Sequence, residues 1–146
     1  MKNILLLLAL LTVPYVVGGV IGMPDDARGN LGLALVFTFT GMGHFLKTDE
    51  MAEMLPPWVP GRRQIIQVTG VLEVLFAVCL FVPLLVRPTG YLIMVFLIAV
   101  LPSNVYATMR RIDFGGHRAG PVYLLARAPL QLLLIVWTYW FVIRPR

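Results

Sequence analysis

The chain has little charge and only one cysteine. Charged residues make up 13% of its 146 residues, whereas soluble domains carry about 25%. Cys79 alone cannot form an internal disulfide or a Cys-x-x-Cys redox centre, and the cysteine and histidine spacing gives no metal motif. No flavin, haem or nucleotide motif is present, which argues against an autonomous oxidoreductase. These shortages leave a membrane protein as the best class.

Hydrophobic residues are abundant, at 59% of the chain with a mean hydropathy of +0.85. Each span needs about 20 apolar residues, and this length predicts five spans, at residues 3–22, 30–46, 64–85, 90–109 and 121–143. We therefore expect an all-α, polytopic membrane helical bundle. Its parts are a first transmembrane helix with an outer turn (residues 1–29) and a four-helix membrane domain (residues 30–146).

The first segment has an alternative interpretation as a cleaved signal peptide. Lys2 supplies a basic start, and Val20-Ile21-Gly22 is a passable cleavage site. Its apolar run is longer than that of a usual signal peptide, and no Ala-x-Ala is present, so a retained helix is favoured.

The basic residues predict the orientation. Seven fall on one side of the five spans, namely Lys2, Lys47, Arg62, Arg63, Arg110, Arg111 and Arg118, and four on the other, namely Arg28, Arg87, Arg144 and Arg146. The positive-inside rule then places the N-terminus inside and the C-terminus outside. Because these residues form no continuous patch, nucleic acid is excluded as a partner and the lipid bilayer is expected instead.

Two inner connections have local patterns. Thr48 is expected to cap a short helix along the membrane surface, followed by the proline-rich run 56–60. The loop 110–120 is rich in glycine and is expected to be flexible.

Polar residues interrupt four of the spans. They are His44, Glu73, Asn104, and the pair Arg127 and Gln131. An ionisable group at such depth costs roughly 2.5 kcal/mol or more and is rare without a function. With a rise of about 1.5 Å per residue, all five fall in the inner half of the membrane. The sequence therefore predicts one shared polar layer.

The expected partners follow from helical faces. Tyr123, Arg127 and Gln131 recur at every fourth residue. Glu73 shares a face with the small residue Gly70, which would let another helix approach closely. Glu73 and Arg127 are expected to form an ion pair, with Arg127 alternatively extending to the inner interface. Tyr106 is a further pocket candidate, although a tyrosine there also suits an interfacial belt.

These motifs resemble, in order, those of the DoxX-like family of small bacterial integral membrane proteins. The matching strings are Gly41-Met42-Gly43-His44-Phe45, Pro56-Pro57-Trp58-Val59-Pro60, Gly70-Val71-Leu72-Glu73, Pro102-Ser103-Asn104-Val105-Tyr106 and Arg127-Ala128-Pro129-Leu130-Gln131. The resemblance covers about residues 37–141. It implies a four-helix membrane domain, in some members associated with membrane redox systems such as a thiosulfate:quinone oxidoreductase. The fold also resembles sterol-isomerase-like and vitamin-K-reductase-like proteins. The first span and the lone Cys79 depart from the family pattern.

Three functions remain open at this point. The first is an accessory protein that binds a lipophilic ligand, a quinone or a lipid, at His44, Asn104 and Gln131, for a membrane redox partner subunit. The second is a membrane enzyme that uses Glu73 or His44 for proton transfer. The third is a structural subunit or homo-oligomer in which the polar residues are interhelical hydrogen bonds.

Overall fold

The computed structural model describes residues 2–144, and within that range it contains helices and turns but no strand. The elements are α1 (Lys2–Val20), α2 (Asp25–Leu46), α3 (Thr48–Ala52), α4 (Arg62–Cys79), α5 (Val86–Met109), η1 (His117–Ala119), α6 (Pro121–Thr138) and the π-helical η2 (Tyr139–Ile143). The expected all-α class is confirmed.

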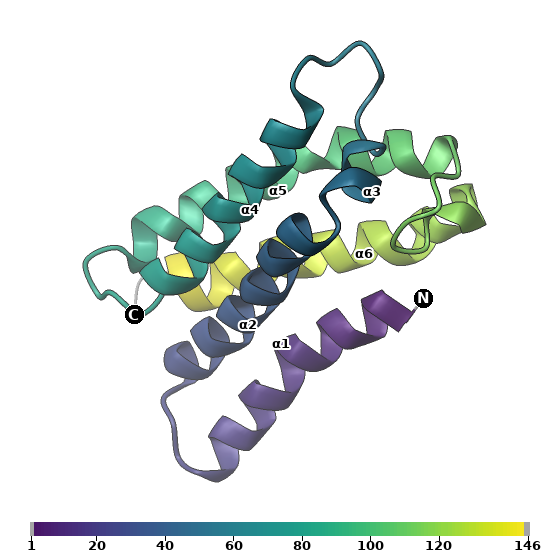
Figure 1. The fold of residues 1–146 in the computed structure, drawn as a ribbon. Coiled ribbons are helices and arrows are strands. Elements are labelled where there is room, and N and C mark those ends of the chain that lie inside the picture. The colour runs from purple at the N-terminus through teal and green to yellow at the C-terminus, as the bar shows by residue number, and fades with distance from the viewer. Residues whose placement is uncertain (1, 145–146) are drawn as a thin grey trace.

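The long helices run back and forth between two ends of a bundle (Figure 1). At one end lie the start of α1, the connection through α3, and the loop 110–120, and we refer to it as the α3 end. At the other lie the α1–α2 turn, the α4–α5 turn and the end of η2, and we refer to it as the η2 end. This order groups the loops as the charge pattern predicted. Arg146 lies outside the described residues.

Among residues 2–144, four helical segments are long and apolar enough to cross a membrane: α1, α2, α5, and α6 together with η2. The second begins at Asp25 and has 22 residues, so the expected start at residue 30 was too late. The segment expected at residues 64–85 is helical only to Cys79. This helix, α4, is not one of the four spanning segments, because Arg62, Arg63 and Glu73 all lie within its 18 residues.

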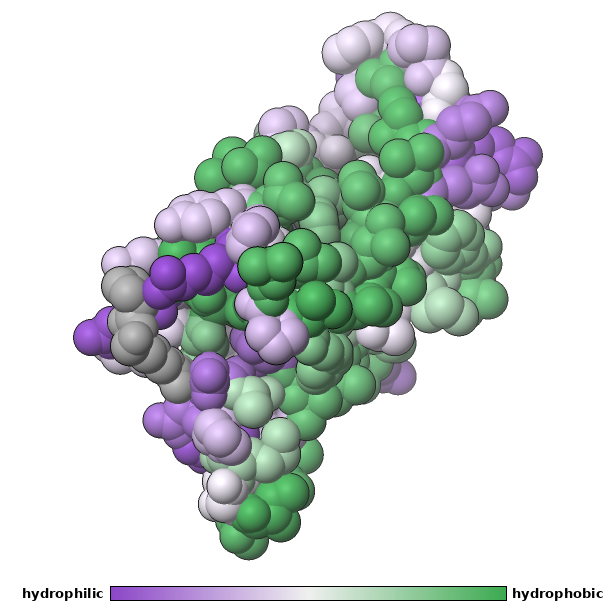
Figure 2. Space-filling view, turned by 90° about the vertical axis from the view of Figure 1, so that its left-hand side faces the viewer, coloured by the Kyte–Doolittle hydropathy of each residue, from purple (hydrophilic) through white to green (hydrophobic). Residues whose placement is uncertain are grey.

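The surface of the bundle is divided as a membrane protein requires. Figure 2 shows hydrophilic residues gathered toward the two ends, with a wide hydrophobic region between them. On α5 the side chains of Leu92, Val95 and Ile98 are all largely exposed. Because soluble monomers rarely expose continuous apolar areas of this extent, this region is suited to hydrocarbon.

Helices α2 and α4 pack closely because two glycines face each other. A Cβ atom added to Gly41 would lie 3.1 Å from the carbonyl oxygen of Gly70, and one added to Gly70 would lie 2.6 Å from His44 Cβ. The small-residue face predicted on α4 is therefore in contact with α2. Beyond it, the rings of Phe37, Phe76 and Phe96 pack with centroids 5.6–6.4 Å apart and close the core between α2, α4 and α5.

The short helix α3 is present, but Thr48 does not cap it. Lys47 occupies the N-cap position without a side-chain bond, and the Thr48 hydroxyl donates to the carbonyl of His44 at 2.7 Å. Because a threonine oxygen can bond back to the preceding turn, it serves α2 instead. The first turn of α3 is held by Lys47 Nζ, 2.9 Å from Glu50, and this contact lowers the pKa of the exposed Glu50 carboxyl.

Candidate functional site

His44 is placed near the end of α2 and its ring is turned toward α4. The side chain is buried, and the absence of a side chain at Gly70 leaves room for it. Its Nδ1 lies 2.8 Å from the carbonyl oxygen of Ile66 and 2.9 Å from the hydroxyl of Thr69. These contacts fix the orientation of the ring against α4.

The partners of His44 determine where its protons are. A carbonyl oxygen can only accept, so Nδ1 carries a hydrogen and donates it toward Ile66. The other nitrogen, Nε2, lies 3.5 Å from Oε1 of Glu73. Without a proton between them, the imidazole nitrogen and the carboxylate oxygen would repel each other, because both present lone pairs. The pair therefore holds one shared proton, either as imidazolium and carboxylate or as neutral imidazole and carboxylic acid.

Glu73 is 6% exposed, and its second carboxyl oxygen, Oε2, has no hydrogen-bond partner within residues 2–144. The expected ion pair with Arg127 is not formed. The Glu73 carboxyl interacts with Arg127 electrostatically, but the side chain with which it forms an ion pair is His44. The sequence analysis therefore assigned Glu73 the wrong partner.

The remaining predicted residues lie on α5 and α6. Gln131 is buried and its amide Nε2 donates to the carbonyl of Leu97, while its Oε1 has no partner in the described chain. Arg127 Nε is likewise buried without a partner there. Asn104 is buried, and its main-chain carbonyl accepts a hydrogen bond from Thr108 at 2.7 Å. Helix α6 thus carries two polar groups with unused hydrogen-bonding capacity.

Tyr106 is separate from these groups. Its ring is half-buried near the end of α5, and the guanidinium of Arg110 lies 5.8 Å from the ring centre. Within residues 2–144 no hydrogen bond joins its hydroxyl to the polar layer. We therefore leave it out of the candidate site.

The sequence did not single out His117, which is buried in η1. Thr108 donates its hydroxyl hydrogen to Asn104, so at 2.7 Å it accepts one from His117 Nδ1. Burial, and then the charge of Arg127, lower the pKa of His117 to about 4, so the imidazole is neutral at pH 7. A histidine among glycines gives no periodic pattern. The only available hint was that the chain has just two histidines.

His117 and its neighbours anchor the loop that was expected to be flexible. Its ring packs edge-on against Tyr123 at 4.8 Å, and the Tyr123 hydroxyl donates to the carbonyl of Gly115 at 2.7 Å. Gly115 and Gly116 adopt φ values of +63° and +108°, which favour glycine. The loop thus closes over the start of α6, next to the polar layer.

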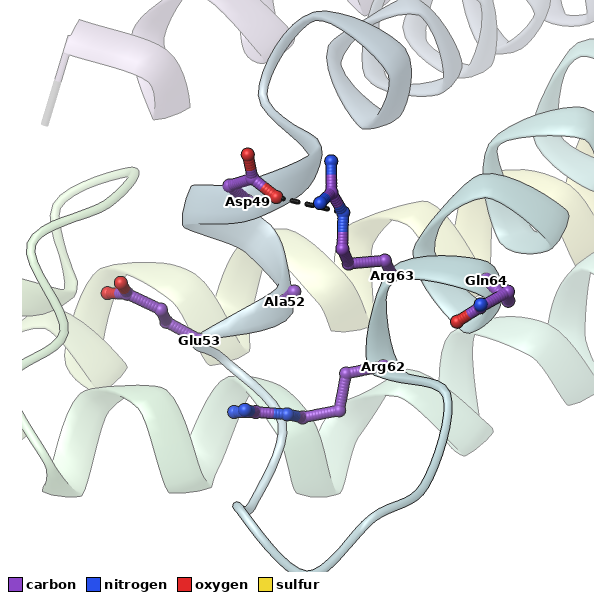
Figure 3. A pocket seen from close by; sticks show the side chains of 6 residues that line it. All are labelled: Asp49, Ala52, Glu53, Arg62, Arg63 and Gln64. Carbon is purple, nitrogen blue, oxygen red and sulfur yellow. Dashed lines mark ion pairs between the residues drawn. The ribbon is translucent and has the colours of Figure 1, made fainter.

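Two cavities lie away from the polar layer. One of about 450 Å³ lies between α3 and the start of α4, lined by Asp49, Ala52, Glu53, Arg62, Arg63 and Gln64. Figure 3 shows Arg63 reaching across it to Asp49, with Nε 3.0 Å from the carboxylate. The other, of about 610 Å³, is a groove at the η2 end. Neither of these two cavities is lined by the predicted site residues.

A family model described as a domain of unknown function, DUF8561, matches residues 33–142. The chain belongs to this family. No curated protein and no solved structure matches it. The resemblance to DoxX-like proteins therefore stays a prediction.

The DUF8561 segment contains all the candidate site residues, from His44 to Gln131. Chemically, it combines a carboxyl and an imidazole that share a proton with amide and guanidinium groups that have unused hydrogen-bonding capacity. Such a set can hydrogen-bond a polar head on an otherwise apolar molecule, or move a proton to or from it. Within residues 2–144 no three histidine, cysteine or acidic side chains gather as a metal site would require.

Proposed function

We propose that the polar layer binds a small lipophilic molecule through a hydrogen-bonding head group, such as the carbonyl of a quinone or the polar head of a lipid. The observation that carries this proposal is the set of buried polar atoms without partners: Glu73 Oε2, Arg127 Nε and Gln131 Oε1. A buried polar group left unpaired costs roughly 1–3 kcal/mol. These three atoms lie on α4 and α6, within the residues predicted from the sequence to form one polar layer, and a ligand bound there would complete their hydrogen bonds.

The ligand class follows from the surroundings of these atoms. The rings of Phe37, Phe76 and Phe96 pack on one another in the core between α2, α4 and α5, and many large apolar side chains are exposed on the bundle surface. A molecule that reaches the layer from the bilayer must therefore be apolar over most of its surface. Arg127 and Gln131 would hydrogen-bond its oxygen atoms, and the pair His44 and Glu73 would supply or take up the proton.

We further propose an accessory role beside a membrane redox subunit, which rests on the resemblance to DoxX-like proteins alone. For the cell, we propose a bacterial cytoplasmic membrane with the α3 end inside, because the basic loops gather at that end. Cysteine labelling at positions 50 and 113, in a background where Cys79 is alanine, tests the orientation. Accessibility of both positions from outside the cell would reverse it.

The binding test uses Asn104→Leu. This change removes a donor and an acceptor and keeps a similar volume. The Asn104 side chain forms no hydrogen bond within residues 2–144. We therefore expect a nearly unchanged melting temperature but a loss of the co-purifying lipophilic molecule. Lipids extracted from wild type and variant are compared by mass spectrometry.

The matched control is Thr89→Val, which removes a buried hydroxyl from the opposite end of the same helix. It should leave the extracted molecule in place. If Asn104→Leu, and His44→Leu beside it, retain the same lipid profile as wild type, the binding proposal fails and a structural role for the polar layer remains.

The proton shared by His44 and Glu73 favours a second candidate, an enzyme that isomerises its bound substrate by proton transfer. Such an enzyme exchanges a substrate proton with solvent. Protein incubated in D₂O should then introduce deuterium into the co-purifying molecule, and Glu73→Gln should not. A bound molecule that stays unlabelled in wild type excludes this candidate while leaving the binding proposal intact.

A further inference from the structure

The groove at the η2 end is a second place where polar groups meet apolar walls, and it is separate from the proposed ligand site. It has a volume of about 610 Å³ and lies among the start of α2, the α4–α5 turn and η2. Leu31, Phe81 and Val86 contribute apolar walls, and Arg87 and Arg144 contribute guanidinium groups. Asp26 also lines it.

The two arginines give the groove a net positive charge. Both are exposed, and within residues 2–144 neither forms an ion pair. Arg144 instead lies over the ring of Trp140, at 4.2 Å from its centre. The neighbouring carboxylate Asp25 is already paired with Arg28. Arg87 also lies in the first turn of α5, where the helix dipole disfavours a cation. An anion between the two guanidiniums would stabilise both.

Asn30 adds a polar group with unused capacity. It lines the groove, is 9% exposed, and donates through Nδ2 to the carbonyl of Leu80 at 3.4 Å. Its Oδ1 has no partner in the described chain. A buried carbonyl oxygen needs a donor. The groove therefore presents two guanidinium groups as donors, the Asn30 oxygen as an acceptor without a partner in the described chain, and the Asp26 carboxylate beside them.

We propose that this groove binds the headgroup of a membrane phospholipid. Arg87 and Arg144 would hold the phosphate, Asn30 would accept from a hydroxyl or ammonium group of the headgroup, and Phe81 and Val86 would contact the glycerol and first acyl carbons. The lining of the groove supports a lipid, because apolar side chains such as Leu31, Phe81 and Val86 lie beside the two arginines. Free phosphate would gain nothing from the apolar walls.

The test measures lipid binding to the purified full chain by native mass spectrometry. Phosphatidylglycerol is compared with diacylglycerol, which has the same tails but no phosphate, and with inorganic phosphate. Wild type should retain phosphatidylglycerol and release the other two. The double variant Arg87→Gln with Arg144→Gln should bind phosphatidylglycerol at least about tenfold more weakly, because it loses two charge-assisted contacts.

The control is Arg118→Gln, an arginine at the α3 end with an exposed side chain, and it should bind phosphatidylglycerol as wild type does. Equal binding by wild type and the double variant overturns the proposal, as does equal retention of diacylglycerol or of inorganic phosphate. If the double variant does not fold, wild type is crosslinked with a photoactivatable phosphatidylglycerol. Adducts should then map to the groove, and adducts confined to the α3 end overturn the proposal.

Discussion

Removing either member of the His44 and Glu73 pair should have very different effects on stability. His44→Leu leaves the Glu73 carboxyl buried at 6% exposure after losing its ion-pair partner, with its other oxygen already unpartnered. Breaking one side of a buried pair in this way costs roughly 3–5 kcal/mol. Glu73→Met leaves His44 neutral and keeps its bond to the Ile66 carbonyl at 2.8 Å, so we expect a loss of about 1 kcal/mol.

The double variant should be no worse than Glu73→Met, because it leaves no unpaired charge. The coupling energy between the two positions is then about 3–5 kcal/mol. Coulomb's law supports this size. Two unit charges at the 3.5 Å that separates Nε2 from Oε1 attract by about 5 kcal/mol at an effective dielectric constant of about 20, and desolvation offsets part of that.

The assay is reversible unfolding in mixed detergent micelles, with free energies of unfolding for wild type, both single variants and the double variant. As a control, Glu73→Met is combined with Thr38→Val. The Thr38 hydroxyl bonds to Ala34 within α2 at 2.8 Å, so these two losses should add. Two results would refute the reasoning: losses for His44 and Glu73 that add within about 0.5 kcal/mol, or a milder effect for His44→Leu than for Glu73→Met.

Two more changes test the packing of the bundle and its loop. Gly70→Ala should destabilise by about 1–3 kcal/mol, because the new Cβ would meet His44 Cβ at 2.6 Å, whereas Gly43→Ala, with nothing within 4 Å, should not destabilise in the same unfolding assay. His117 has a folded pKa of about 4, below its ordinary 6.5, so the unfolded chain takes up its proton first. Stability should fall as pH decreases from about 6.5 to 4, by about 1–3 kcal/mol with solvent screening, and His117→Asn should remove that dependence. A pH-independent difference between wild type and His117→Asn would contradict it.

The helices and the burial of polar residues such as Glu73 and Gln131 could be predicted because they depend on local patterns. Apolar runs of sufficient length define a span, and a lone carboxyl at residue 73 within such a run is conspicuous whatever surrounds it. The same holds for Gly70, whose position next to Glu73 on one face correctly indicated a close helix contact.

The partner of Glu73 could not be predicted, because it depends on how two helices cross. Counting about 1.5 Å per residue placed all five polar residues in the inner half of the membrane. It could not show which of them touch, because it treats every helix as upright and as beginning where its apolar run begins. Helix α2 instead begins at Asp25, and the contact of Gly41 with Gly70 sets its crossing with α4. His117 was missed for a similar reason. Its burial comes from Tyr123 and Thr108, which other parts of the chain supply.

The close packing of α2 and α4 has a consequence for how the chain enters the membrane. Helix α4 lacks the apolar composition of the four spanning segments, since Glu73 and two arginines lie within it. On α4, Glu73 forms its ion pair with His44 of α2. Only the short α3 and its connections separate α2 from α4 in the sequence, so the two helices are synthesised one soon after the other. We expect α4 to leave the translocation machinery only as a hairpin with α2. The two helices would then be one unit of biogenesis, so that a variant which separates them, such as Gly70→Ala, lowers the amount of inserted protein as well as its stability.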